Sequence, residues 1–567
     1  MAANETIEIT IPNYGTLRGS VDRSRRVAVF RNVPYAVVPE RWRAAVKPQP
    51  WTGVRDATKQ GPICPQMPSL YPLHLLVPKD LQPLGTGKYQ FGLDHDEYHC
   101  LNLNIYVPLA ALQPDAKPVP VMAWIHGGAY RDGSNAVPLY NASNFVHHSI
   151  LLHQPVIVIA INYRVNVFGF LASQELIHDI SSTSSDLPPY DQSVGNWGLM
   201  DQKLAFEWIR SNIAAFGGQT NNITAWGESA GSISIHYHLL TPSHHGLFDH
   251  AIMQSGTVNT ITPGFPQKEG QPIFDALLQG LGIPLDLNKE EKIKRLRALP
   301  GEDLAKVGNA ITTGGYRPFY DGGKVIPSKI PIQFLAKDLA AYDPNLKSVL
   351  IGANKDEGTA FARLFGELSM QTWPTLLQKM CPVQELMPLF TSIYGTPETD
   401  VDVLRIVAKY TGDMMFMYPT LVLNDTLLAL AKKRSSESGP GLKVSHYLFD
   451  AEMQKMVELV PGLGALHAGE LPMLFSPPLA EKVLTIEELA LGKEMQRVWI
   501  AFANQQEELV HAKSIPFRVA GDRRGIELAE EELRDGGVYM SKDAERFWKT
   551  LATGQEKIIS TAFSEQA

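Results

Sequence analysis

The sequence of 567 residues lacks several features that would each point to a particular class of protein. It has no basic excess, because 51 Lys and Arg stand against 59 Asp and Glu for a net charge of −8, so nucleic-acid binding has no support. No uninterrupted apolar run approaches the roughly 20 residues that span a bilayer, so we expect no stable membrane insertion. No Gly/Ser linker, low-complexity segment or repeat interrupts the chain, which predicts one large domain over residues 1–567.

The N-terminus and the few cysteines bear on the cellular compartment. Residues 1–11 alternate polar and apolar side chains and lack the continuous apolar segment of a signal peptide. We therefore expect a cytoplasmic protein, or a secreted one if the given N-terminus is incomplete. Only three cysteines are present, and Cys381 is expected to be a buried, unpaired thiol.

The most informative stretch that is present is Gly227-Glu228-Ser229-Ala230-Gly231. Apolar residues at 223–226 precede it and a helix-like run over 230–240 follows, which is the strand–turn–helix context of a nucleophile elbow. Such a tight turn strains the backbone at the serine, and a Cβ two residues to either side would collide with the neighbouring strand or helix. A G-x-S-x-G pentapeptide also arises by chance, so its partners decide whether Ser229 is a nucleophile.

A serine hydroxyl needs donors that hold the oxyanion formed after its attack. Residues 124–130, with the sequence WIHGGAY, follow a predicted buried strand at Val119–Ile125. Consecutive glycines leave backbone N–H groups unobstructed, and the residue after the nucleophile, Ala230, supplies a second source of donors. The alternative is an ordinary turn at the end of a strand. The position of the segment upstream of the elbow favours an oxyanion hole.

The serine also needs an acid and a base, expected in the chain order Ser, Asp or Glu, His. A predicted strand at Val349–Ile351 leads into Asp356 and Glu357, and either carboxylate could be the acid on chemistry alone. His467 lies in the loop after a further predicted strand at 447–449. Its position and the small residues around it favour His467 as the base over the other histidines of the chain.

Several motifs in the same order make the chain resemble the type-B carboxylesterase/lipase family, which includes cholinesterases, liver-type carboxylesterases and fungal lipases. The resemblance implies an α/β-hydrolase fold, with a large, mostly parallel central sheet flanked by helices and with loop and helical insertions that form a gorge. Apolar runs suited to the buried strands also occur at 121–125, 156–161 and 252–253. Besides the elbow, the motifs that carry the resemblance are FRNVPYA (30–36), GNWGLMDQ (195–202), Asn212-Ile213, FGG (216–218) and QSG (254–256).

The resemblance assigns the triad that chemistry leaves open. The acid of the family is the Glu of a D-E-G triplet, which implies Glu357, with Asp356 structural. The base lies in an H-x-x-E-L-P-like segment, which implies His467. Ser229 would then attack an ester carbonyl and form an acyl-enzyme that water cleaves, and no metal or organic cofactor is implied.

The resemblance also implies roles around the triad. Gly128 and Ala129 would donate to the oxyanion together with Ala230, and the methyl group of Ala129, where the family has glycine, would narrow the pocket. Ser255 would support the acid–base pair, and Glu228 would border the site. For these last two residues a purely structural role is equally open.

Substrate identity is less well indicated than chemistry. By resemblance Cys64 and Cys100 would form a disulfide closing a loop at the rim of the gorge; this loop is either a fixed rim over an esterase pocket or, with several leucines, the mobile lid of a lipase. It contains no Trp, which disfavours choline esters. We expect a small-molecule ester as substrate. A metabolite-specific biosynthetic esterase or acyltransferase and a non-catalytic binding protein are the alternatives, and nothing indicates an oligomeric state.

Overall fold

The structure, a computed structural model, describes residues 5–67, 93–183, 186–312, 314–327, 331–437, 441–459, 464–478, 480–506, 517–521 and 540–553. The apolar residues of the expected rim or lid, between 70 and 77, lie outside these ranges. The strands are β1 (Thr6–Ile11), β2 (Gly15–Asp22), β3 (Val27–Pro34), β4 (Val54–Asp56), β5 (Asn102–Pro108), β6 (Val119–Ile125), β7 (Ile157–Ile161), β8 (Gly218–Glu228), β9 (His250–Gln254), β10 (Ser348–Asn354), β11 (Lys443–Phe449) and β12 (Phe517–Gly521).

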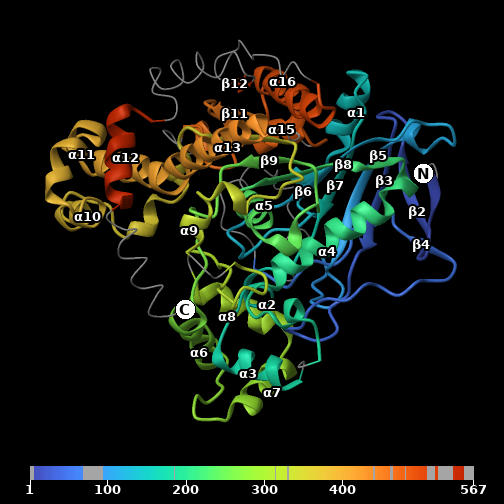
Figure 1. Cartoon of the computed structure of the whole chain (residues 1–567), viewed down its shortest axis with the longest axis horizontal. Coiled ribbons are helices and arrows are strands. Elements are labelled where there is room, and N and C mark those ends of the chain that lie inside the picture. Colours follow the sequence, from blue (N-terminus) through green and yellow to red (C-terminus); the bar gives the residue numbers. More distant parts are fainter. Residues whose placement is uncertain are drawn as a thin grey trace.

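The strands form one twelve-stranded sheet in the order β1-β2-β3-β5-β7-β6-β8-β9-β10-β11-β12, with β4 paired to β2 (Figure 1). The six consecutive strands from β7 to β11 in this order run parallel to one another. Between β1 and β7, and between β11 and β12, neighbouring strands in this order pair antiparallel. Strand β8, which leads into the serine elbow, lies between β6 and β9. The expected large, mostly parallel sheet is therefore confirmed.

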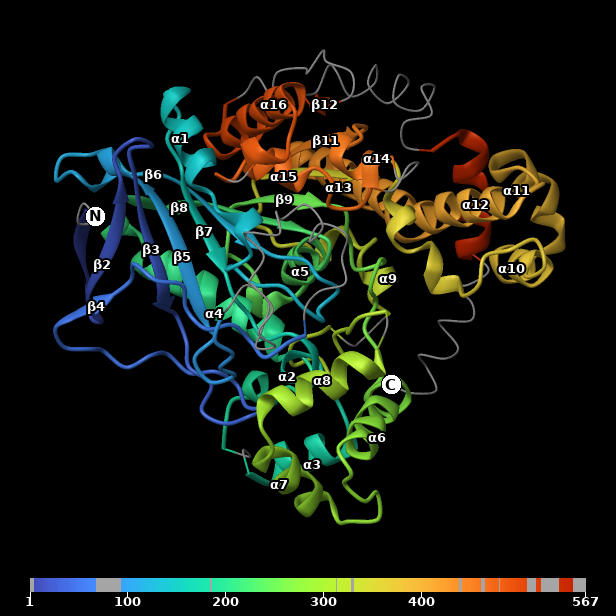
Figure 2. The same cartoon turned by 180° about the vertical axis from the view of Figure 1, so that it is seen from behind.

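The helices cover the sheet on both faces. They are α1 (Ser143–Leu151), α2 (Asn166–Gly169), α3 (Gln174–Thr183), α4 (Trp197–Asn212), α5 (Ala230–Leu240), α6 (Gln271–Gly280), α7 (Lys289–Ala298), α8 (Gly301–Ile311), α9 (Ile332–Leu335), α10 (Trp373–Met380), α11 (Met387–Tyr394), α12 (Asp400–Gly412), α13 (Tyr418–Ser436), α14 (Gln454–Leu459), α15 (Leu471–Phe475) and α16 (Ile486–Ala503). Apolar residues of α4, α5 and α13 pack on one face of the sheet, and those of α1, α15 and α16 pack on the other (Figure 2).

Strand β6 shows why these residues form a central strand. Its sequence VPVMAWI is buried along its whole length. Successive side chains of a strand point to opposite faces, so Ala123 joins the apolar core on the side of α5, whereas Trp124 joins the core on the side of α16. A run that is apolar at nearly every position suits a parallel strand covered on both faces, as the sequence indicated.

A helical stretch from Asp400 to Ser436 joins α12, the π-helical turn η13 (Asp413–Met417) and α13. By length and composition it is apolar enough to cross a membrane, although half of its apolar window is buried inside the protein. A core helix of a soluble protein meets the same criterion. Its α12 part packs with α10, α11 and residues 542–553 in a separate apolar cluster.

The expected disulfide is not formed: Cys64, Cys100 and Cys381 are all buried free thiols. The thiol of Cys64 donates to the carbonyl of Val165 at 3.9 Å, and that of Cys100 donates to the carbonyl of Glu97 at 3.8 Å. A hydrogen bond with Cys64 and burial raise the pKa of Cys100 well above its usual value. Because the thiolate is the reactive form of cysteine, this environment lowers the reactivity of Cys100.

Candidate active site

Ser229 lies at a sharp turn between β8 and α5. Its φ of 54° and ψ of −122° are unusual for a residue with a side chain, and its N–H donates to the carbonyl of Gln254 at 2.9 Å. A Cβ added to Gly231 would lie 2.0 Å from the carbonyl oxygen of Ile125, and one added to Gly227 would lie 2.6 Å from the carbonyl carbon of Gly231. The two glycines therefore allow the turn that presents Ser229 at the end of a central strand.

Glu357 and His467 form a buried hydrogen-bonded pair. The Nδ1 atom of His467 lies 2.5 Å from Oε2 of Glu357, and both side chains are nearly inaccessible to solvent. Asp356 points elsewhere, because its Oδ2 accepts the N–H of Ala465 at 2.9 Å and its own N–H donates back to the Ala465 carbonyl at 3.0 Å. Of the two neighbouring carboxylates, Glu357 contacts the imidazole of His467, whereas the two hydrogen bonds of Asp356 with Ala465 hold the loop that contains His467.

Glu228 places a second carboxylate on the other side of the imidazole. Its Oε1 lies 3.1 Å from Nε2 of His467. Burial raises the pKa of Glu228 to about 8 against the opposing effect of His467. Burial lowers the pKa of His467, but Glu228 and Glu357 outweigh that effect and raise it to about 9. The side chain of Glu228, next to Ser229 in the chain, therefore interacts electrostatically with the Glu357–His467 pair.

Three further residues connect Glu357 with the loop that contains His467, and the sequence pattern predicted a role for none of them. Asn354, the last residue of β10, donates its backbone N–H to Oε1 of Glu357 at 2.7 Å and its side-chain amide to the carbonyl of Leu466 at 2.7 Å. The same amide donates to Oε2 of Glu470 at 2.6 Å, whose Oε1 accepts from Gln254 at 2.7 Å. Glu470 and Gln254 stood inside recognised motifs, whereas no sequence signal marked Asn354.

The glycine segment after β6 lies against the nucleophile. A Cβ added to Gly127 would stand 3.0 Å from Cβ of Ser229. Gly128 has a φ of 105°, and Ala129, at 53°, holds the left-handed conformation although it is not glycine. The carbonyl of Ala129 accepts the N–H of Tyr316 at 2.9 Å. Helix α5 begins at Ala230, so the N–H of that residue has no partner within the helix.

Ser255 lies in the loop directly after β9, and its support of the Glu357–His467 pair stays a prediction. Its Oγ is buried and has no hydrogen-bond partner within the described part of the chain. Its N–H donates to the carbonyl of Gly352 at 2.8 Å, and its φ is 54°. The hydrogen bond that Glu357 accepts from the backbone comes from Asn354.

The sequence profile of the Carboxylesterase family matches residues 5–531. The chain belongs to this family. It is 30% identical over 514 residues to para-nitrobenzyl esterase of Bacillus subtilis (strain 168), and the aligned residues cover 88% of this chain and 90% of that protein. It is 32% identical over 506 residues to cholinesterase of Mus musculus, covering 84% of this chain and 75% of that protein. A crystal structure of a Geobacillus stearothermophilus carboxylesterase has a TM-score of 0.66 and 28% identity, covering 92% of this chain and 99% of that one.

Aromatic rings flank the imidazole in this carboxylesterase. The ring centroids of Phe361 and Phe416 lie 5.0 and 4.6 Å from that of His467. Phe361 follows η10 (Glu357–Ala360), and Phe416 belongs to η13, so the segment after the acid and the π-helical turn both reach the base. Apolar neighbours of this kind exclude water and strengthen the interaction of the base with its carboxylates.

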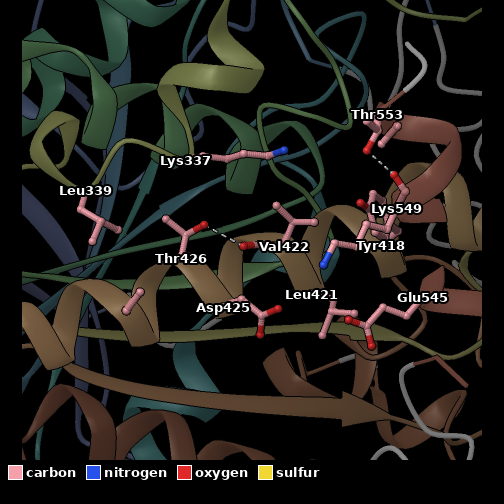
Figure 3. Close-up of a pocket in the computed structure, with 12 residues that line it drawn as sticks. Lys337, Leu339, Tyr418, Leu421, Val422, Asp425, Thr426, Glu545, Lys549 and Thr553 are labelled. Carbon is pink, nitrogen blue, oxygen red and sulfur yellow. Dashed lines mark hydrogen bonds between the residues drawn. The ribbon is translucent and has the colours of Figure 1, made fainter. Parts of the chain in front are cut away.

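A depression elsewhere on the carboxylesterase, of about 480 Å³, lies between α13 and the helical residues 542–553 (Figure 3). Lysines and carboxylates both line it, including Lys337, Asp425, Glu545 and Lys549, and no residue of the Ser229 site does so. Among the described residues no group of three or more His, Cys, Asp and Glu side chains could hold a metal ion. The chemistry described above is therefore concentrated at the serine elbow.

Proposed function

We propose that this carboxylesterase hydrolyses small carboxylic esters through an acyl-enzyme on Ser229, with Glu357 and His467 completing the triad. The observation that carries the proposal is the buried Glu357–His467 hydrogen bond beside the strained serine elbow. Two relatives, the para-nitrobenzyl esterase of Bacillus subtilis (strain 168) and an acylcarnitine hydrolase of Mus musculus, support an ester substrate.

In this mechanism His467 takes the proton of Ser229 as the hydroxyl oxygen attacks the ester carbonyl carbon. Glu357 holds the imidazole by its Nδ1 and stabilises the charge that develops on it. The N–H groups of Gly128, Ala129 and Ala230 hold the oxyanion of the tetrahedral intermediate. The alcohol leaves with the proton from His467, and water, activated in the same way, releases the acid and restores Ser229.

The test is the hydrolysis of a p-nitrophenyl ester series from acetate to palmitate by the wild-type enzyme and by Ser229→Ala. We expect activity that is highest with short acyl chains, and a loss of about 10³-fold or more in kcat in the variant, because no other hydroxyl occupies the elbow. Ser211→Ala is the matched control, since Ser211 is an exposed serine on α4 that only caps a carbonyl of its own helix. It should retain wild-type rates.

Other outcomes would replace this proposal. Comparable activity in Ser229→Ala would remove Ser229 from the mechanism. A long-chain optimum that rises sharply above the solubility limit of the substrate would make the enzyme a lipase. No activity on any ester, with no labelling of Ser229 by a fluorophosphonate, would leave the non-catalytic binding protein as the explanation. Labelling without ester hydrolysis would indicate a metabolite-specific biosynthetic enzyme.

A further inference from the structure

Five polar side chains form a hydrogen-bonded line through the core, and two of them, Ser234 and His238, belong to α5. The hydroxyl of Tyr190 lies 2.8 Å from Nε2 of His244, whose Nδ1 lies 2.7 Å from Nδ1 of His238. The Nε2 atom of His238 lies 2.9 Å from Oε1 of Gln202, and the amide nitrogen of Gln202 lies 3.2 Å from the hydroxyl of Ser234. Tyr190 is half-buried, and the other four side chains are almost completely buried.

The orientation of Gln202 sets the direction of every bond in this line. Its amide nitrogen donates to Ser234, so its oxygen accepts, and Nε2 of His238 must carry a proton. Burial lowers the pKa of His238 to about 3 and that of His244 well below its usual value, so both imidazoles are neutral. Nδ1 of His238 is therefore an acceptor, His244 donates to it from Nδ1, and Tyr190 donates to His244.

The charged groups near the line favour neutral imidazoles. The Nζ atom of Lys203, on α4, lies 5.1 Å from the ring centroid of Tyr190. Its charge lowers the pKa of both His238 and His244, and His245 also lowers the pKa of His244. Glu207, Asp191 and other carboxylates act on Tyr190, whose pKa burial raises well above its usual value. Tyr190 therefore keeps its proton, and the line stays a one-way chain of donors near neutral pH.

The inner end of the line reaches the two segments that carry the proposed oxyanion donors. The hydroxyl of Ser234 donates to the carbonyl of Ala230 at 2.7 Å, and it also lies 3.1 Å from the hydroxyl of Tyr130. Ala230 is the first residue of α5, and Tyr130 follows Ala129 in the chain. Ser234 therefore contacts Ala230 itself and the residue that follows Ala129.

We propose that Tyr190, His244 and His238 are positioning residues, which act through Gln202 and Ser234 to hold the oxyanion donors of Ala230 and Ala129 in place. This inference rests on the proposed function of Ser229. The outer end, Tyr190, belongs to η5 (Pro189–Gln192), so the position of this short helical turn is coupled to the geometry of the site. Each donor in the line polarises the next, which strengthens the last bond to Ala230.

The consequence is an effect on turnover rather than on substrate binding. Donors of an oxyanion hole act on charge that develops in the transition state, so a small displacement lowers kcat and leaves KM nearly unchanged. The loss of a whole donor costs about 10²–10³ in rate, and a displaced donor costs less. A role in stability alone would change the melting temperature and leave kcat per active site unchanged.

The experiment is a double-mutant cycle of Tyr190→Phe and Ser234→Ala on the full chain. Rates are expressed per active site labelled by a fluorophosphonate, so that unfolded protein does not count. We expect kcat to fall about 3-fold in Tyr190→Phe and about 10-fold in Ser234→Ala, with KM within about 2-fold of wild type. The double variant should resemble Ser234→Ala, about 10-fold, because the line is already cut at its inner end. Tyr190→Phe removes only the hydroxyl and keeps the aromatic ring that the ammonium group of Lys203 contacts.

Tyr237→Phe is the matched control. Tyr237 lies on α5, as Ser234 does, but its hydroxyl donates to the carbonyl of Ile261 at 2.8 Å and is not part of the line. Its kcat should equal that of wild type. If Ser234→Ala does not fold, His238→Gln replaces it, because glutamine can keep the bond to Gln202 while removing the one to His244. Losses that multiply to about 30-fold, an unchanged kcat in Tyr190→Phe, or an equal loss in Tyr237→Phe would each overturn the inference. If the Ser229→Ala variant hydrolysed esters at the wild-type rate, the proposed function itself would be refuted.

Discussion

At the residue scale, the proposed base, His467, has a carboxylate on each side of its ring: Glu228 at Nε2 and Glu357 at Nδ1. His467 must be neutral to take a proton, and Glu228, 3.1 Å from its Nε2, favours the charged form and helps to raise its pKa to about 9. Removing that carboxylate with Glu228→Gln should lower the pKa of His467. Activity is lost as pH falls through this pKa, so we expect the acid limb of kcat/KM to move to lower pH by about one unit.

The pH–rate profile of p-nitrophenyl acetate hydrolysis checks this expectation. Glu290→Gln is the control, because Glu290 is an exposed glutamate that lies near His178 and faces no residue of the triad. Its profile should coincide with that of wild type. An acid limb of Glu228→Gln that stays in place or moves to higher pH would show that Glu228 does not act on the base through its charge.

At the element scale, the contact of β8 and α5 depends on glycines that have no room for a side chain. A methyl group on Gly231 would stand 2.0 Å from the carbonyl oxygen of Ile125 in β6, and neither backbone can yield easily. We expect Gly231→Ala to lower the free energy of unfolding by about 3 kcal/mol or more and to abolish fluorophosphonate labelling, because α5 must shift away from the elbow.

Thermal melting together with labelling measures this effect. Gly314→Ala is the matched control, since a Cβ at Gly314 has no neighbour within 4 Å and its φ lies outside the left-handed region. It should melt and label like the wild-type enzyme. Wild-type labelling in Gly231→Ala would mean that the elbow does not depend on this close approach.

Also at the element scale, the limits of prediction follow from which contacts are local. The pattern around Ser229 predicted β8, the turn and α5 because apolar periodicity and the glycines act within about 20 residues. The choice between Asp356 and Glu357 could not be made from chemistry, because it depends on Ala465 and His467, more than 100 residues away in the chain. Asn354 was missed for the same reason, since its partners Leu466 and Glu470 come from that distant loop.

At the scale of the whole molecule, the fold class was expected from the family resemblance, and the apolar runs of β6 and β10 agree with it because both strands are buried along their whole length. The disulfide expectation failed because it rested on spacing in a family rather than on the surroundings of each sulfur. Cys64 and Cys100 remain free thiols that hydrogen-bond to each other and to the backbone carbonyls of Val165 and Glu97. Such preferences depend on tertiary contacts that no local pattern encodes.

A buried ion pair gives a prediction at this same scale, because it joins segments that are far apart in the chain. Arg164, after β7, donates to both carboxylate oxygens of Asp201 on α4, at 2.8 and 2.7 Å, and to the carbonyl of Arg43 at 2.7 Å. Asp201→Asn would leave the guanidinium buried without its counter-charge, and we expect the free energy of unfolding to fall by about 3–5 kcal/mol.

The urea midpoint for loss of activity and of tryptophan fluorescence measures that loss of stability. Glu291→Gln is the control, because Glu291 pairs with Arg295 in adjacent turns of α7, where the two side chains are 35% and 47% exposed. An exposed pair contributes at most about 0.5 kcal/mol, so the midpoint of this control should barely move. Equal midpoints for the two variants would show that Asp201 is not needed to hold the N-terminal segment, β7 and α4 together, and that apolar packing alone joins them.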